Sequence, residues 1–177
     1  MFLQLVYRRA YSGGVPELAE VDQLKDDDRL TAWRLFLESY RRVLDTLDDE
    51  LQSERGLSLA WFDVLVQLFN APDHRLRMNQ LASRILLSKS GLTRLVDRME
   101  AAGLVERASS PTDRRGSFAV LTPRGEGVFR DAFPVHLDGI HKHFARHLTA
   151  AEARTLAKVF EKIRGPLTSA AECAPPD

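Results

Sequence analysis

The stretch that decides the fold is residues 77–125, RMNQLASRILLSKSGLTRLVDRMEAAGLVERASSPTDRRGSFAVLTPRG. Its first part places apolar residues at i, i+3, i+4 and i+7, which predicts one buried face of a short helix. After a brief break, Ser88 can cap a second helix that carries its own inward apolar stripe. The two stripes are Met78, Leu81, Ala82 and Ile85 in the first helix, and Leu92, Leu95, Val96 and Met99 in the second.

The remainder of this stretch predicts a helix stop followed by a hairpin. Gly103 is the residue type that most readily adopts the left-handed conformation just past a helix end. A short strand over 104–108 should follow, then a tight turn over 111–116 and a second strand over 117–121. Helix, turn, helix and hairpin in this order predict a winged helix-turn-helix, a mainly α fold with a small β-hairpin wing.

The outward face of the second helix carries small hydroxyl side chains and arginines. Such a face suits a helix that enters a DNA groove, because hydroxyls and free N–H groups meet phosphates and arginines bind guanine or phosphate through two hydrogen bonds. Arginines at the tip of the wing can reach a narrow minor groove. Ser88 serves equally well as a helix cap alone. The expected DNA-binding residues are Ser88, Lys89, Ser90, Thr93, Arg94, Arg98, Arg114 and Arg115.

Short motifs in this region resemble those of the MarR family of bacterial transcriptional regulators. The resemblance covers about residues 30–167 and implies a regulator in which the N- and C-terminal helices of two subunits intertwine as a dimerisation region. It also places Arg115 at the DNA, whereas Asp113 is expected to shape the turn. The motifs are the run 88–100, Gly103-Leu104-Val105, Asp113-Arg114-Arg115 and Leu121-Thr122-Pro123-Arg124-Gly125, in this order and spacing.

The flanking segments are expected to form helices with long apolar stripes. Apolar residues alternate spacings of three and four from Leu30 to Leu51, and Thr149 with Glu152 predicts a capping box that opens a last helix. Pro134 is expected to kink or interrupt the helix that begins after Thr122. The expected organisation is a poorly ordered extension (1–25), one MarR-like unit (26–170) and a tail (171–177), with a DNA-binding lobe at about 57–122 and dimerisation helices at about 27–53 and 123–168.

A net charge of zero conceals an uneven distribution of charge. Residues 77–116 hold eight Lys or Arg against four Asp or Glu, a net charge of +4, whereas residues 17–55 hold twelve acidic and six basic residues, a net charge of −6. A basic helix-turn-helix and wing, in a chain that is acidic elsewhere, is the charge distribution expected of a DNA-binding protein. The expected partners are double-stranded DNA and a second copy of the chain, on a pseudo-palindromic operator with half-sites one helical turn apart.

Length and composition place few other constraints on the function. A chain of 177 residues suits one domain, and its apolar runs are too short to span a membrane. The apolar start of the chain is followed by arginines rather than preceded by them, unlike a secretory signal. A single cysteine, Cys173, fits a reducing cytoplasm, so a cytoplasmic location is expected.

Aromatic residues on the first two long helices predict a pocket for a small aromatic or apolar anion, although such clusters are more often plain core. Because many MarR proteins respond to such ligands, the resemblance favours a ligand-responsive repressor. The alternatives are a winged-helix protein-interaction module and a metal-responsive regulator that uses the histidines at 143 and 147. We find no catalytic constellation, complete metal-ligand set or cofactor motif, so no enzyme activity is expected. The expected pocket residues are Trp33, Phe36, Tyr40, Trp61 and Phe62.

Overall fold

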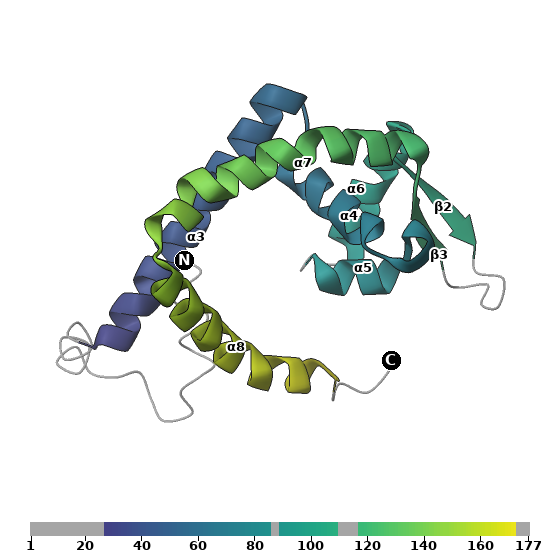
Figure 1. The fold of residues 1–177 in the computed structure, drawn as a ribbon. Helices are drawn as coiled ribbons and strands as arrows, with labels where there is room; N and C mark the ends of the chain where they lie inside the picture. Colours follow the sequence, from purple (N-terminus) through teal and green to yellow (C-terminus); the bar gives the residue numbers. More distant parts are fainter. Residues whose placement is uncertain (1–26, 86–88, 110–116, 173–177) are drawn as a thin grey trace. The chain divides into compact units, whose positions relative to one another are not determined.

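The computed structural model describes residues 27–85, 89–109 and 117–172, with the backbone alone at 89 and 166–172. The chain divides into two units between Arg42 and Val43. The elements are α3 (Asp28–Arg55), α4 (Leu59–Phe69), β1 (Arg75–Arg77), α5 (Met78–Arg84), α6 (Lys89–Ala101), β2 (Val105–Ser109), β3 (Ser117–Leu121), α7 (Pro123–His143) and α8 (Ala150–Glu172), with short 3-10 turns at Pro72–His74 and Ala145–His147 (Figure 1).

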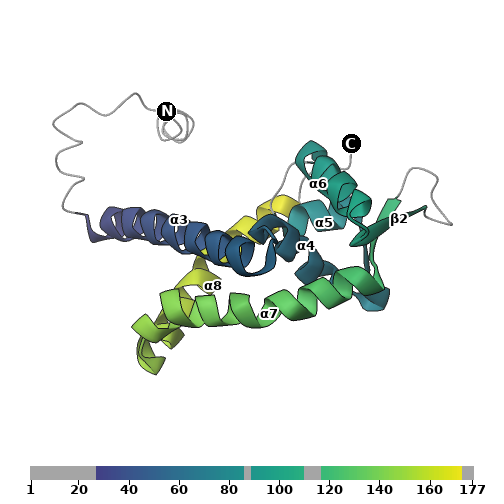
Figure 2. The same cartoon turned by 90° about the horizontal axis from the view of Figure 1, so that it is seen from above.

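The helix-turn-helix expected from the sequence is formed by α5 and α6. The apolar stripe of α6 lies wholly in the core, with each of its four side chains at most 5% exposed. In α5 the inner residues are buried, and the two flanking ones pack against the same core. Figures 1 and 2 show α4, α5 and α6 gathered beside the sheet. The predicted mainly helical fold with a small antiparallel sheet is therefore confirmed.

The end of α6 is set by Gly103, as the sequence predicts. Its φ is +72°, the left-handed region that costs glycine little. The backbone N–H of Leu104 donates to Met99 O at 3.0 Å, and that of Gly103 to Glu100 O at 2.8 Å. This pair of bonds is a Schellman motif, which satisfies the last carbonyls of the helix and turns the chain into β2.

The sheet has three strands rather than the two of the expected hairpin. Its order is β1-β3-β2, with both pairings antiparallel. The sequence did not indicate β1, because three residues are too few to show an alternating pattern and their partners in β3 lie more than 40 residues away. The first hairpin strand also begins at Val105, one residue later than expected.

Helix α7 runs without interruption from Pro123 to His143, so the interruption expected at Pro134 is wrong, whereas the kink stays a prediction. Thr122 caps it as expected, since its Oγ1 accepts the N–H of Gly125 at 2.9 Å. Buried residues hold the helix on the core on both sides of the proline, Ala132 before it and Gly139 after it. This packing offsets the one backbone hydrogen bond that a proline removes.

The predicted capping box at the start of α8 is confirmed. The backbone N–H of Thr149 donates to Glu152 Oε2 at 2.8 Å, and the N–H of Glu152 donates to Thr149 Oγ1 at 3.3 Å. The apolar stripe of α8 is largely exposed in the described chain, with Val159 at 46%, Phe160 at 39% and Ile163 at 54%. No helix among the described residues is long and apolar enough to cross a membrane.

Candidate nucleic-acid interface

The exposed face of α6 carries the described residues expected to bind DNA. Ser90, Thr93, Arg94 and Arg98 are all exposed, opposite the buried stripe of the same helix. Arg94 and Arg98 are four residues apart, so their side chains lie on the same side of the helix. The helical period thus gathers two hydroxyls and two guanidinium groups on one surface.

Arg107 on β2 engages the acidic residues of this helix. Its Nη2 donates to Asp97 Oδ1 at 2.5 Å, and its Nε lies 3.4 Å from Glu100 Oε2. Its backbone N–H also donates to Glu100 Oε1 at 2.9 Å. One arginine therefore joins α6 to the wing strand and compensates the two carboxylates of α6. Sequence reasoning missed this role, because the bond to Asp97 joins residues in different elements.

The two arginines of α6 remain available for an external partner. Within the part of the chain that the structure describes, neither Arg94 nor Arg98 forms an ion pair. Since Arg107 already engages Asp97 and Glu100, the exposed face of α6 presents uncompensated positive charge. Two such guanidinium groups can bind phosphates or guanine edges through paired hydrogen bonds.

The other expected DNA-binding residues fall at the edges of the described segments. Lys89 opens α6, but only its backbone is described, and Ser88, Arg114 and Arg115 lie outside the described residues. Strands β2 and β3 are paired on either side of the segment 110–116, and their outermost described pair is Ser109 with Ser117. The roles of these four residues remain predictions.

The expected pocket residues lie in different environments. Phe62 is only 1% exposed and its ring lies 4.4 Å from that of His136, so it is a core residue and not part of an open pocket wall. Trp61 is partly buried against the same core. In the first unit Trp33, Phe36 and Tyr40 form an exposed row of rings, with centroids 5.9 and 6.0 Å apart.

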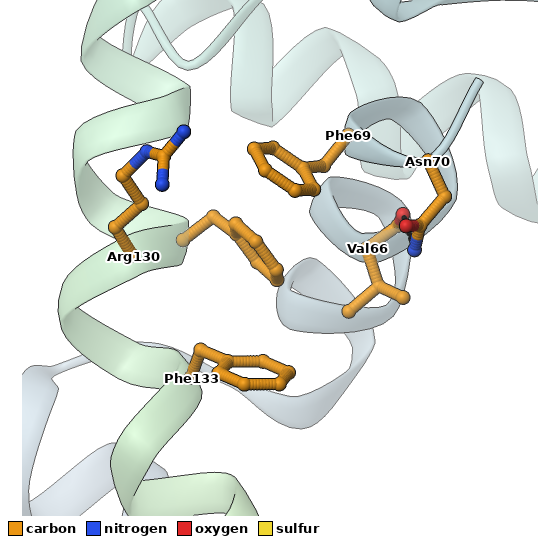
Figure 3. A pocket seen from close by; sticks show the side chains of 6 residues that line it. Val66, Phe69, Asn70, Arg130 and Phe133 are labelled. Atoms are coloured by element: carbon orange, nitrogen blue, oxygen red, sulfur yellow. Dashed lines mark hydrogen bonds between the residues drawn. The ribbon is translucent and has the colours of Figure 1, made fainter.

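A cavity of about 330 Å³ lies between α4 and α7. Its wall is mainly aromatic, and the rings of Phe69 and Phe129 are 4.5 Å apart. The guanidinium of Arg130 lies 5.1 Å from the Phe69 ring and donates to Glu126 Oε1 at 2.7 Å. Such a wall suits a small aromatic molecule with an acceptor group. The lining residues are Val66, Phe69, Asn70, Phe129, Arg130 and Phe133 (Figure 3).

The histidines do not form the arrangement that a metal site would need. His143 ends α7, whereas His147 lies in a separate 3-10 turn, so the two are not one turn apart on a single helix. His143 Nε2 instead lies 2.8 Å from Glu50 Oε1, and hydrogen bonds from His143 and Lys142 lower the pKa of Glu50. Among the described residues no cluster of three His, Cys, Asp or Glu could hold a metal ion.

Comparison with known proteins supports this interpretation of the lobe. The MarR family profile matches residues 55–116. The HTH-type transcriptional regulator MhqR of Bacillus subtilis is 37% identical over 98 residues, which cover 55% of this chain and 66% of that protein. The crystal structure of AbsC, a MarR family transcriptional regulator from Streptomyces coelicolor, is 35% identical with a TM-score of 0.75, and the match covers 81% of this chain and 97% of AbsC.

A second solved structure connects this fold with DNA. Sco3205, a MarR family transcriptional regulator from Streptomyces coelicolor, was crystallised in complex with DNA; it is 33% identical with a TM-score of 0.74, over 78% of this chain and 87% of Sco3205. The fold, the exposed face of α6 and these relatives agree. The chain therefore belongs to the MarR family of transcriptional regulators, and it is a DNA-binding regulator and not an enzyme.

Proposed function

We propose that the chain is a repressor that binds a pseudo-palindromic operator as a homodimer, with α6 of each subunit in a major groove. The observation that carries this proposal is the exposed face of α6. Arg94 and Arg98 point outward without an ion pair among the described residues, while Arg107 engages the acidic groups of the helix. A dimer bound at an operator that overlaps a promoter would exclude the polymerase, which is why repression is the expected output.

The second copy of the chain is inferred from apolar surface that the described chain leaves uncovered. Val159, Phe160 and Ile163, all on α8, are 46%, 39% and 54% exposed. Contiguous exposed apolar side chains on a helix mark a protein interface. A two-fold axis through such an interface would place two recognition helices about 34 Å apart, one turn of B-DNA.

The proposed contacts divide into two groups by their place in the fold. The residues of α6 and its N-terminal end would read the major groove and its phosphates, and the wing arginines would enter the adjacent minor groove. Phosphate contacts would fix the register, and arginine–guanine contacts would supply sequence preference. The proposed set is Ser88, Lys89, Ser90, Thr93, Arg94, Arg98, Arg114 and Arg115.

Alanine variants of one arginine from each group test the reading surface. Arg94→Ala should weaken operator binding by about 1–3 kcal/mol and relax the preference at one position of each half-site. Arg115→Ala should weaken binding most on sites with A·T-rich flanks. Arg146→Ala, an exposed arginine beyond the other end of α7, is the matched control. Wild-type affinity in both test variants on the selected operator would show that the assigned surface is wrong.

Footprinting and sedimentation test the homodimer. We expect protection of two half-sites within about 16–20 base pairs and a dimer at micromolar concentration. Protection of a single half-site, or a monomer in sedimentation, would contradict the proposal.

The proposed effector is a small aromatic or apolar anion, and the α4–α7 cavity is its best-supported place. Bound there, it would change operator affinity only if it prefers the conformation in which the recognition helices do not fit the DNA. A tenfold loss of affinity requires a coupling of about 1.4 kcal/mol. Aromatic carboxylates and phenols should raise the melting temperature and release the operator in the wild type but not in Phe133→Asp. An effector with the same effect on both proteins would place the site elsewhere.

A further inference from the structure

A glycine of α7 lies against the second half of α3, residues 43–55. Gly139 is buried, and a Cβ atom added to it would lie 2.6 Å from Leu47 Cδ2 and 2.8 Å from Glu50 Oε2. Both side chains would have to move to admit that atom, so this close approach of the two helices depends on a residue without a side chain. Leu47 is only 3% exposed, which shows that the contact is closed to solvent.

One turn beyond this glycine, a carboxylate of α3 joins the last turn of α7. Glu50 Oε1 accepts hydrogen bonds from His143 Nε2 at 2.8 Å and from Lys142 Nζ at 3.1 Å. These hydrogen bonds lower the pKa of Glu50, so its carboxylate is ionised at neutral pH. The side chains of Glu50 and His143 are only 24% and 26% exposed, so water screens their contact less than it screens a surface ion pair. We call Glu50, Lys142 and His143 the α3–α7 clamp.

The two ends of α7 are held in different ways. Nearer the lobe, Phe129 and Ala132 are buried in the core, and Arg55 Nε donates to Asp131 O at 3.0 Å. Residues 140–143, the last turn of α7, are all described, and none of them is buried. Hydrogen bonds to a charged group are stronger than those between neutral groups, and they have a preferred direction. The clamp therefore restrains a turn that the core does not hold.

We propose that the α3–α7 clamp sets the separation of the two recognition helices in the homodimer, with Glu50 as its positioning residue. This inference rests on the proposed function, in which a dimer engages two half-sites. Helix α7 begins directly after β3 and ends just before the short turn that leads into α8, the proposed dimer helix. Pro134 removes one backbone hydrogen bond within α7, so the direction of its last turn depends more on contacts such as the clamp. A change in that direction would move one α6 relative to the other.

Operators with altered half-site spacing test the clamp. The probes are the operator selected from random duplexes and derivatives with one base pair added or removed between the half-sites, a change of about 3.4 Å and about 35°. The wild type should bind the derivatives about 30-fold more weakly, because a dimer of fixed geometry cannot engage both half-sites at once. We call this ratio of affinities the spacing penalty. Glu50→Ala should reduce it to about fivefold or less, with the base preference within each half-site unchanged.

Three further variants separate positioning from loss of charge and from loss of stability. Glu54→Ala removes the same charge from an exposed position of the same helix and should keep the wild-type spacing penalty. Glu50→Gln keeps an acceptor oxygen and should retain more of the penalty than Glu50→Ala. Gly139→Ala keeps every charge but displaces the Glu50 carboxylate, so it should reduce the penalty although alanine favours a helix more than glycine does. Circular dichroism and melting curves establish that each variant is folded.

The outcomes also separate this inference from the proposed function. A folded Glu50→Ala variant with the wild-type spacing penalty overturns the role of the clamp, even if the operator is bound as proposed. An equal loss of affinity on all spacings overturns it as well, because it indicates a structural role alone. If Glu50→Ala is unfolded, Gly139→Ala and Lys142→Ala/His143→Ala carry the test, and the wild-type penalty in both overturns the proposal. A wild-type protein that is insensitive to spacing would contradict the proposed function itself, and the role of the clamp with it.

Discussion

Helices α6 and α8 carry the same kind of apolar stripe, yet the stripes have opposite environments. In α6 the stripe is almost completely buried, with Val96 and Met99 at 0% exposed. In α8 the corresponding side chains are open, with Val159 at 46% and Ile163 at 54%. The periodicity of a sequence identifies which face of a helix is apolar, and the packing partner decides whether that face is buried. For α6 the partner is the lobe, and for α8 we propose a second copy of the chain.

The largest expected effect is on the free energy of unfolding, and it distinguishes a buried core residue from a residue of the proposed dimer interface. Leu65→Ala, at a side chain with no exposed surface, should lower the free energy of unfolding by about 2–5 kcal/mol through a buried cavity. The loss should be the same at low and high protein concentration. Ile163→Ala should cost less, and its effect should depend on concentration, because a dimer is stabilised by mass action. Urea denaturation at two protein concentrations measures both quantities.

Two carboxylates on the open stripe should disrupt the dimer and leave the lobe folded. Phe160→Asp/Ile163→Asp should raise the dimer dissociation constant by at least about 100-fold, or about 2.8 kcal/mol. Operator affinity should fall as well, because two linked half-site contacts become independent. Lys158→Asp introduces the same side chain on the other face of α8 and is the control. If the double variant stayed dimeric in sedimentation equilibrium, the apolar stripe of α8 would not be the dimer interface.

The wing strand and α6 offer a third test. Arg107→Ala leaves Asp97 and Glu100 uncompensated near the proposed DNA surface, so operator affinity should fall by about tenfold. The loss of stability should be near 1 kcal/mol, since these ion pairs are partly exposed. Arg107→Ala/Asp97→Asn should recover part of the affinity, because it removes the unpaired charge. No recovery in the double variant would mean that Arg107 acts by packing alone.

The structural features that the sequence predicted correctly depend on interactions between residues that are close together in the chain. The caps at Thr122 and Thr149, the stop at Gly103 and the stripe of α6 all depend on neighbours at most five positions away. Hydrogen bonds and helix periods of this range can be inferred from residue types alone. This is why the helix-turn-helix and the surface of α6 could be predicted.

The features that were missed depend on residues far apart in the chain. Strand β1 exists because it pairs with β3, and the α4–α7 cavity exists because Phe69 meets Phe129, 60 positions later. Glu50 and His143 meet across an even longer separation. Packing on both sides of Pro134 likewise keeps α7 continuous against the local preference of proline. Such contacts follow from the tertiary arrangement, which a single sequence does not display.

The smallest expected effect is a change in the pH dependence of stability. It comes from His136 on α7, a half-buried histidine that packs against the core of the lobe. Its ring packs 4.4 Å from that of Phe62, and its Nδ1 has no hydrogen-bond partner among the described residues. Burial lowers the pKa of His136 below 6.5, because the charged imidazolium loses hydration there. Below pH 6.5 the unfolded chain therefore binds this proton more readily than the folded one.

The sign of the pH dependence follows from this difference. The contribution of neutral His136 to stability is fully present above pH 6.5, and it is lost as the pH falls from 6.5 through the lowered pKa of the folded state. His136→Phe removes the titrating group and keeps an aromatic ring on Phe62, so its stability should change less over this window. Subtracting the two urea titrations at each pH cancels groups common to both proteins, such as Asp63, whose pKa burial raises. If the free energies of unfolding of the two proteins change in parallel with pH, the His136 ring is open to water. This end of the core would then be less well shielded from solvent than the buried stripe of α6.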